Sequence, residues 1–248
     1  MAHDVEFHRG RDGSYLYVPK IDRPCPSILV LHGSDGGAAG WSHWQALLFA
    51  MQGFCTFAPS YCKGGNSWHA GDILDVDLDE TEEALIWLRQ HELSNDKVGL
   101  FGVSRGAEHA LLVASLMAET DSKGLPDAVA VHSPSDTIVG AFIAKNFDPN
   151  ESGIWDPSLR AWRWRGSSDN LLPTSPIRIE QYHGPIMLTH GAADSVWTVD
   201  CTRRLEARLT AQGKKPEVHY YEGQDHGVTP DAHNVQHERT VAFFARHL

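Results

Sequence analysis

Residues 97–106 read KVGLFGVSRG, and this stretch decides the fold. Lys97–Gly102 is an apolar run of strand length, and it leads straight into Gly102-Val103-Ser104-Arg105-Gly106, the G-x-S-x-G pattern. A helical pattern follows over Ala107–Met117. The two glycines leave room for a sharp strand-to-helix turn, which exposes the hydroxyl of the serine between them. The stretch therefore predicts a strand, a nucleophilic serine at position 104 and a helix, in that order.

The same alternation of apolar runs and helical patterns extends in both directions. Strands are predicted at Val5–Phe7, Tyr15–Val18, Ser27–Leu31, Phe54–Pro59, Lys97–Gly102, Ala128–His132, Ile186–Thr189 and Glu217–Tyr221. Helices are predicted at Trp41–Gln52, Asp75–His91, Ala107–Met117, Val199–Gln212 and Asn234–Leu248. Such alternation is typical of an α/β protein with a mostly parallel, doubly wound sheet. Residues 135–180 are rich in proline and tryptophan and break the rhythm, so we expect one domain over 1–248 with a cap-like insertion there.

A serine hydroxyl needs a base, and the base needs an acid that orients it. His226, in the loop after the last predicted strand, is the expected base, because ligand sites lie beyond the carboxyl ends of parallel strands. His109 is nearer to Ser104 in sequence, but five residues down a helix it points away from the turn. Asp194, one loop beyond the strand at Ile186–Thr189, is the expected acid. The order Ser104, Asp194, His226 is that of the G-x-S-x-G hydrolases.

Two other aspartates compete with Asp194 for the role of the acid. Asp136 follows the preceding predicted strand, and Asp225 stands next to His226 in the sequence. Adjacency in sequence does not give Asp225 a usable geometry toward the imidazole. The loop position of Asp194 favours it over Asp136.

An oxyanion that forms during acyl transfer needs two backbone N–H groups. The first is expected from Arg105, directly after the serine. The second is expected from the glycine-rich loop at residues 32–37, HGSDGG, with Ser34 as first choice and Asp35 as second. A plain glycine-rich turn is the alternative reading of this loop. A phosphate-binding loop is disfavoured because no Gly-Lys-Ser/Thr follows.

Tryptophans gather in the insertion and just after Asp194. Trp155 and Trp197 are the predicted substrate-binding residues, because aromatic side chains over the site could line an apolar acyl pocket. Trp162 and Trp164 either join them or only pack the insertion onto the sheet. If the insertion is purely structural, the pocket is built from the loop at residues 34–44 and Trp197.

Composition excludes several classes of function. The chain has 248 residues, with 32 acidic against 21 basic side chains and a formal net charge of −11, so a nucleic-acid partner would be repelled. No apolar run approaches ~18 residues, so no membrane span is predicted. The 15 histidines and four cysteines show no metal-ligand spacing, and we expect neither metal nor cofactor. With no secretory signal pattern at its start, the chain is expected to be cytoplasmic with reduced thiols.

With these motifs in order, the chain resembles the α/β-hydrolase superfamily from Ser27 onward. Within it, the sequence is similar to the dienelactone-hydrolase-like branch, above all to the catalytic domain of acyl-CoA thioesterases and bile acid-CoA:amino acid N-acyltransferases. Residues 32–37 (HGSDGG), 53–58 (GFCTFA), 99–108 (GLFGVSRGAE) and 194–197 (DSVW) carry the resemblance. It implies an α/β-hydrolase fold and an enzyme that cleaves or transfers acyl groups.

Three departures bear on the reaction. Enzymes of the thioesterase and transferase type usually carry an N-terminal β-sandwich, for which 248 residues leave no room. The N-acyltransferases and the dienelactone hydrolases use a cysteine nucleophile, where position 104 is serine. The resemblance, taken with these departures, favours hydrolysis of small carboxylic esters through an acyl-enzyme. Acyl-CoA thioesterase or acyltransferase activity is the alternative, with Arg160, Arg163 and Arg165 as a basic patch for coenzyme A. A catalytically inactive binding protein is the third.

Overall fold

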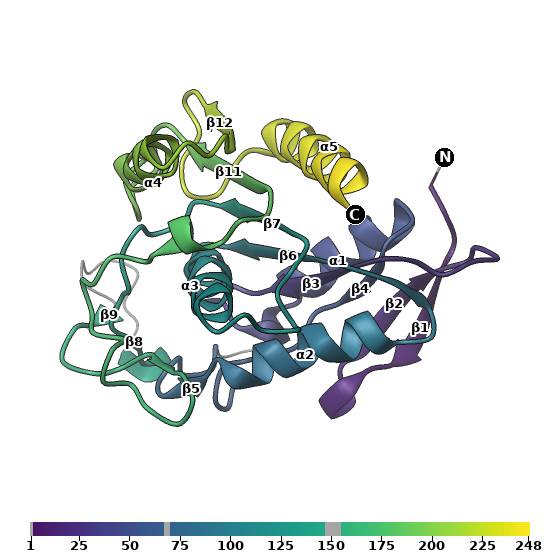
Figure 1. Ribbon diagram of the computed structural model, residues 1–248, viewed down its shortest axis with the longest axis horizontal. Coiled ribbons are helices and arrows are strands. Elements are labelled where there is room, and N and C mark those ends of the chain that lie inside the picture. Colours follow the sequence, from purple (N-terminus) through teal and green to yellow (C-terminus); the bar gives the residue numbers. More distant parts are fainter. Residues whose placement is uncertain (1, 67–69, 147–154) are drawn as a thin grey trace.

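A computed structural model describes residues 2–66, 70–146 and 155–248, and its centre is an eight-stranded sheet (Figure 1). In spatial order the strands are β1 (Val5–Arg9), β2 (Tyr15–Pro19), β4 (Cys55–Phe57), β3 (Cys25–Leu31), β6 (Ser94–Val103), β7 (Ala128–His132), β11 (Ile186–Gly191) and β12 (Glu217–Tyr221). From β4 to β12 all neighbours pair parallel, and only β1 and β2 run antiparallel to their neighbours. The predicted mostly parallel α/β sheet is confirmed.

Five helices cover the two faces of this sheet: α1 (Trp41–Met51), α2 (Asp79–Gln90), α3 (Arg105–Glu119), α4 (Asp200–Ala211) and α5 (Pro230–His247). Phe49 of α1 and Phe244 of α5 share one hydrophobic cluster with Val30 of the sheet. Leu85 of α2, Leu111 of α3 and other residues of α2, α3 and α4 belong to a second, larger cluster. The sheet is thus buried on both faces, which explains why its parallel strands read as continuous apolar runs.

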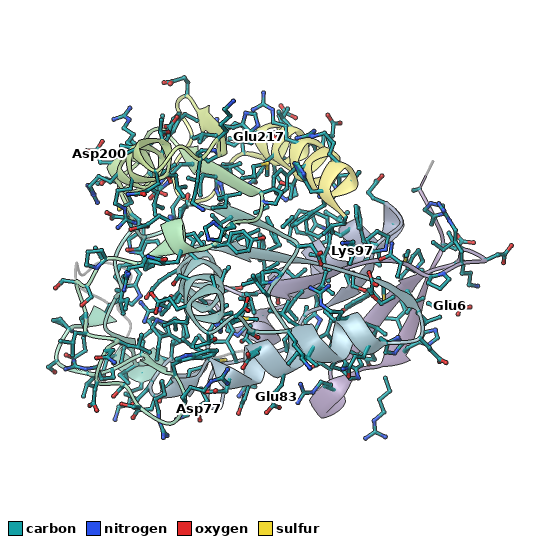
Figure 2. All side chains as sticks on the ribbon, viewed as in Figure 1. Glu6, Asp77, Glu83, Lys97, Asp200 and Glu217 are labelled. Carbon is teal, nitrogen blue, oxygen red and sulfur yellow. The ribbon has the colours of Figure 1, made fainter. Side chains whose placement is uncertain are left out.

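The charged side chains lie mainly at the outside of these layers. In Figure 2, Glu6, Asp77 and Asp200 lie at the periphery of the molecule. No helix among residues 2–66, 70–146 and 155–248 has both the length and the apolar character that crossing a bilayer requires. The four cysteines are all free thiols.

The cap segment, residues 135–180, contains only short elements, and its residues 147–154 lie outside the described part of the chain. Strand β8 (Ala141–Phe142) pairs antiparallel with β9 (Trp155–Asp156). Strand β10 (Trp162–Arg163) pairs with β5 (Val76–Asp77), which lies outside the segment. Single turns of 3₁₀ helix occur at Arg11–Gly13, Gly37–Ala39, Ala144–Asn146 and Ile179–Gln181.

Pairing with the cap segment explains one difference from the sequence prediction. The helix expected from Asp75 begins only at Asp79. Val76 donates its N–H to Ala161 O and Leu78 donates to Arg163 O, at 2.8 and 2.9 Å. Asp75 has a φ of 48°, and Val76 and Asp77 are extended in β5, so none of the three is helical and tertiary pairing overrides the local helical pattern.

A buried ion pair fastens the cap segment to α3. Arg105 Nη1 lies 2.9 Å from Glu108 Oε2, and both side chains are fully buried. Trp162 Nε1 and Val139 N donate to Glu108 Oε1 at 2.8 and 2.9 Å, and Arg105 Nη2 donates to Gly140 O at 2.6 Å. The guanidinium also lies 5.1 Å from the centre of the Trp162 ring. The two buried charges thus bind each other and also hydrogen-bond to groups of the cap segment. A buried ion pair is tolerated when its charges have such additional partners.

Candidate active site

Ser104 stands at the sharp turn between β6 and α3. Its backbone has φ 54° and ψ −121°, an unfavourable conformation for a residue with a side chain. A Cβ on Gly102 would lie 2.1 Å from Gly106 O, and a Cβ on Gly106 would lie 2.4 Å from His32 O. Glycine is therefore required on both sides of the turn, and the turn leaves the serine at the carboxyl end of β6.

Three side chains from three different loops form one hydrogen-bonded chain. Ser104 Oγ lies 2.8 Å from His226 Nε2, and His226 Nδ1 lies 2.8 Å from Asp194 Oδ2. An ionised carboxylate only accepts, so Nδ1 carries the proton and Nε2 accepts from the serine hydroxyl. This tautomer is the one that a base for Ser104 must have.

Asp194 is held in its ionised form. Its Oδ1 accepts from Val196 N and Trp197 N, both at 2.9 Å, while His190 Nε2 lies 3.1 Å from Oδ2. Burial alone would raise the pKa of this carboxyl, but hydrogen bonds from His190 and His226 hold the pKa far below its ordinary value. The carboxylate opposite His226 is therefore negatively charged at neutral pH.

Sequence reasoning missed His190, the last but one residue of β11. It is fully buried, its Nδ1 lies 2.7 Å from Thr202 Oγ1, and its Nε2 lies 2.8 Å from Trp197 O besides reaching Asp194. The histidine thereby fixes both the carboxylate and the loop that carries it. A signal was present, because a His-Gly pair ends β11 (His190-Gly191) just as another directly follows β3 (His32-Gly33).

The competing residues lie elsewhere. Asp136 binds Arg204 through two bonds of 2.7 Å, from Nε to Oδ2 and from Nη2 to Oδ1. Asp225 accepts from Ser195 N and from the backbone N–H of His226, and so links the acid loop to the base loop. His109 is buried with its Nε2 2.9 Å from Thr81 Oγ1.

The glycine-rich loop lies against the serine. A Cβ on Gly33 would lie 3.6 Å from Ser104 Cβ, and Ser34 shares the cavity above the serine. The Ser34 hydroxyl is buried and has no hydrogen-bond partner in the described part of the chain. It is thus a buried polar group near Ser104 without a partner among the described residues.

Tyr61 fixes the start of this loop through His32. The Tyr61 hydroxyl donates to His32 O at 2.6 Å, Tyr61 N donates to His32 Nε2 at 3.2 Å, and the two rings stack 3.8 Å apart. His32 Nδ1 lies 2.7 Å from Gly33 O and must donate to it. Burial lowers the pKa of His32 to about 4, so the imidazole is neutral at pH 7.

A cavity of about 440 Å³ opens over Ser104 and His226. Trp155 lines it, while Trp197 packs on Trp155 at 5.2 Å and edge-on to His226 at 6.1 Å, measured between ring centres. Trp162 is completely buried where the cap segment packs on α3, and Trp164 stacks on Arg165 at 4.1 Å. Of the tryptophans in the cap segment, Trp155 is thus the one that lines the cavity.

Acyl-coenzyme A thioesterases are among the curated proteins that this chain resembles in sequence. Mouse acyl-coenzyme A thioesterase 6 is 29% identical over 237 residues, which cover 91% of this chain and 54% of that protein. Mouse peroxisomal succinyl-coenzyme A thioesterase is 26% identical over 245 residues, with the same two coverages. The chain thus spans about half the length of the curated relatives it matches.

Solved structures show the fold. Acylaminoacyl peptidase from Pyrococcus horikoshii superposes with a TM-score of 0.72 at 15% identity, covering 100% of this chain and 42% of that one. A Klebsiella pneumoniae protein described as a dienelactone hydrolase gives 0.69 at 16%, covering 99% of both. The α/β-hydrolase fold and the expected resemblance are confirmed. The model of the prolyl oligopeptidase family matches residues 40–248, and the chain belongs to that family.

Proposed function

We propose that this protein is a serine hydrolase that cleaves carboxylic esters through an acyl-enzyme. The observation that carries the proposal is the chain of two 2.8 Å hydrogen bonds from Ser104 through His226 to Asp194. A serine hydroxyl paired with a base that a carboxylate orients is the arrangement that nucleophilic acyl transfer needs.

The first half of the reaction forms the acyl-enzyme. Ser104 Oγ attacks the acyl carbon while His226 Nε2 takes its proton. Asp194 stabilises the imidazolium that results, and it stays ionised throughout. The oxyanion binds the N–H of Arg105 at the start of α3 and the N–H of Ser34. His226 then returns the proton to the departing alcohol oxygen.

The second half releases the acid. A water molecule gives a proton to His226 and adds to the acyl carbon, and the same two N–H groups bind the second oxyanion. The bond to Ser104 Oγ then breaks, and His226 returns the proton to the serine.

Hydrolysis of acyl-CoA thioesters is the second candidate, favoured by the thioesterase relatives at 25–29% identity. The basic patch that coenzyme A would need is weakened in this structure. Arg165 binds Asp79 and Glu82, with Nη1 2.6 Å from a carboxylate oxygen of each. Arg163 lies 3.6 Å from Asp77. A guanidinium that already binds a carboxylate binds a phosphate less strongly. We therefore favour a carboxylic ester over an acyl-CoA thioester as the substrate.

A substrate panel tests the proposal. p-Nitrophenyl esters of two to ten carbons are compared with acyl-CoA substrates of the same lengths, and a fluorophosphonate probe identifies the nucleophile. We expect higher kcat/KM for the esters and labelling at Ser104 alone. A faster reaction with acyl-CoA selects the thioesterase, labelling of another serine overturns the assignment, and no turnover or labelling indicates a binding protein.

A further inference from the structure

A second cavity lies behind His226, between the first turns of α1 and α5. Its volume is about 410 Å³, within the range of small-molecule sites. It shares four lining residues with the cavity over Ser104, and these form the boundary between the two: Trp41, Val103, His226 and Gly227. We call it the α1/α5 cavity. The two cavities are therefore adjacent, and these four residues separate the α1/α5 cavity from the space over Ser104.

Aromatic rings form part of the wall of the α1/α5 cavity. Trp44 of α1 stacks on His233 of α5, with ring centres 4.6 Å apart and planes 28° apart. The Gln45 amide donates to His233 Nε2 at 2.5 Å, and burial lowers the pKa of that histidine, so His233 is neutral. Asn234 and Pro230 complete the wall on the α5 side.

His132, which also lines the α1/α5 cavity, is uncharged as well. His132, at the end of β7, is buried, and burial lowers its pKa to about 3. Thr189 Oγ1 donates to Val131 O and accepts from Gln236, so His132 Nδ1 must be the donor in its 2.9 Å contact with Thr189. None of the described residues that line the cavity is an Asp, Glu, Lys or Arg. Anionic or cationic groups would therefore enter without a counter-charge, at a large desolvation cost.

We infer that the α1/α5 cavity binds an uncharged apolar substituent of the ester substrate, an alkyl chain or a ring, and that Trp44 and Asn234 limit its length. The inference rests on the proposed function and names the substrate class for that site. It also restricts where coenzyme A could lie, because the phosphates of a thioester substrate would have to remain outside this cavity.

Two adjacent positions on α5 provide a matched test. Asn234 lines the cavity, whereas its neighbour Val235 does not line it and is 42% exposed. We expect Asn234→Phe to lower kcat/KM for octanoyl or octyl esters about 10-fold relative to ethyl acetate, and Val235→Phe to leave the ratio unchanged. Trp44→Ala, which removes one aromatic side chain from the wall of the cavity, should raise the ratio for longer substituents.

Two substrate series distinguish the two possible sources of the apolar group. p-Nitrophenyl esters vary the acyl chain with a fixed leaving group, and alkyl acetates vary the alcohol with a fixed acyl group. An effect of Asn234→Phe confined to the first series places the acyl chain in the cavity, and an effect confined to the second places the alcohol there. Unchanged preference in both series, with a folded variant, overturns the inference.

A binding measurement separates this inference from the proposed function. 1-Octanol is titrated by calorimetry into the Ser104→Ala protein, which cannot turn over an ester. Binding that Asn234→Phe weakens at least 10-fold and Val235→Phe does not supports the cavity even if no ester is hydrolysed. Equal binding to all three proteins refutes it even if ester hydrolysis is established.

Discussion

Replacing Asp194 by asparagine tests the candidate site most directly. Oδ1 of Asp194 accepts two backbone N–H groups, from Val196 and Trp197, at 2.9 Å each. An asparagine must keep its oxygen at that position, because an NH₂ group there would face two donors. Its NH₂ then points at His226 Nδ1 and at His190 Nε2, where the aspartate has its second oxygen.

The expected loss follows from the tautomer. Facing an NH₂ group, His226 must accept at Nδ1 and carry its proton on Nε2, so it cannot take the proton of Ser104. Loss of the correct tautomer in a triad lowers kcat about 10⁴-fold, which corresponds to about 5.4 kcal/mol of transition-state stabilisation. The side chain keeps its size and most of its hydrogen bonds, so the protein should stay folded.

Asp136→Asn is the matched control, since it makes the same chemical change in the rival aspartate. Asp136 faces Arg204 and not an imidazole, so we expect kcat within about 10-fold of wild type. Loss of charge-assisted bonds should lower the free energy of unfolding by about 2 kcal/mol. Initial rates with p-nitrophenyl acetate at one pH, together with thermal unfolding, decide the matter. A crippled Asp136→Asn beside an active Asp194→Asn would refute the assignment of the acid.

Three further outcomes are expected. Ser104→Ala should lower kcat at least about 10⁴-fold without changing the melting temperature by more than a few degrees, as ester kinetics and circular dichroism can show. Trp155→Ala should change the kcat/KM ratio of short to medium acyl esters about 5-fold, because Trp155 lines the cavity over the serine, whereas Trp162→Ala should lower the melting temperature and leave the ratio unchanged. Burial lowers the pKa of His32 to about 4 and of His132 to about 3, while the same side chains protonate near 6.5 once unfolded. The unfolded state therefore binds more protons below pH 6.5, and each histidine should lower the free energy of unfolding by about 2 kcal/mol between pH 8 and pH 5, which urea titrations at the two pH values measure.

Local patterns predicted most of the central fold. β7 (Ala128–His132) and β12 (Glu217–Tyr221) have the expected bounds, because each is a short apolar or β-branched run between turn residues. The sharp turn at Ser104 could also be predicted from the sequence, because steric crowding requires glycine at positions 102 and 106. Such features depend on neighbours in the sequence, and these are visible without a structure.

Features that depend on residues distant in the sequence could not be predicted from local patterns. Helix α2 begins at Asp79 and not at the predicted Asp75 because Val76 pairs with the distant residue Trp162 and its N–H bonds to residue 161. His190 escaped notice because its role depends on Asp194, Thr202 and Trp197 meeting in space. Trp155 lines the cavity whereas Trp162 is buried against α3, and this difference likewise depends on Glu108, whose burial no sequence pattern indicates.

The junction of Arg105, Glu108 and Trp162 has a consequence for exchanging parts between relatives. The cap segment supplies an indole donor, a backbone N–H and a backbone carbonyl to two charged side chains of α3. A cap transplanted from another hydrolase without those three groups would leave a carboxylate and a guanidinium buried without their full set of partners. In this chain the cap segment and α3 therefore have to be inherited together.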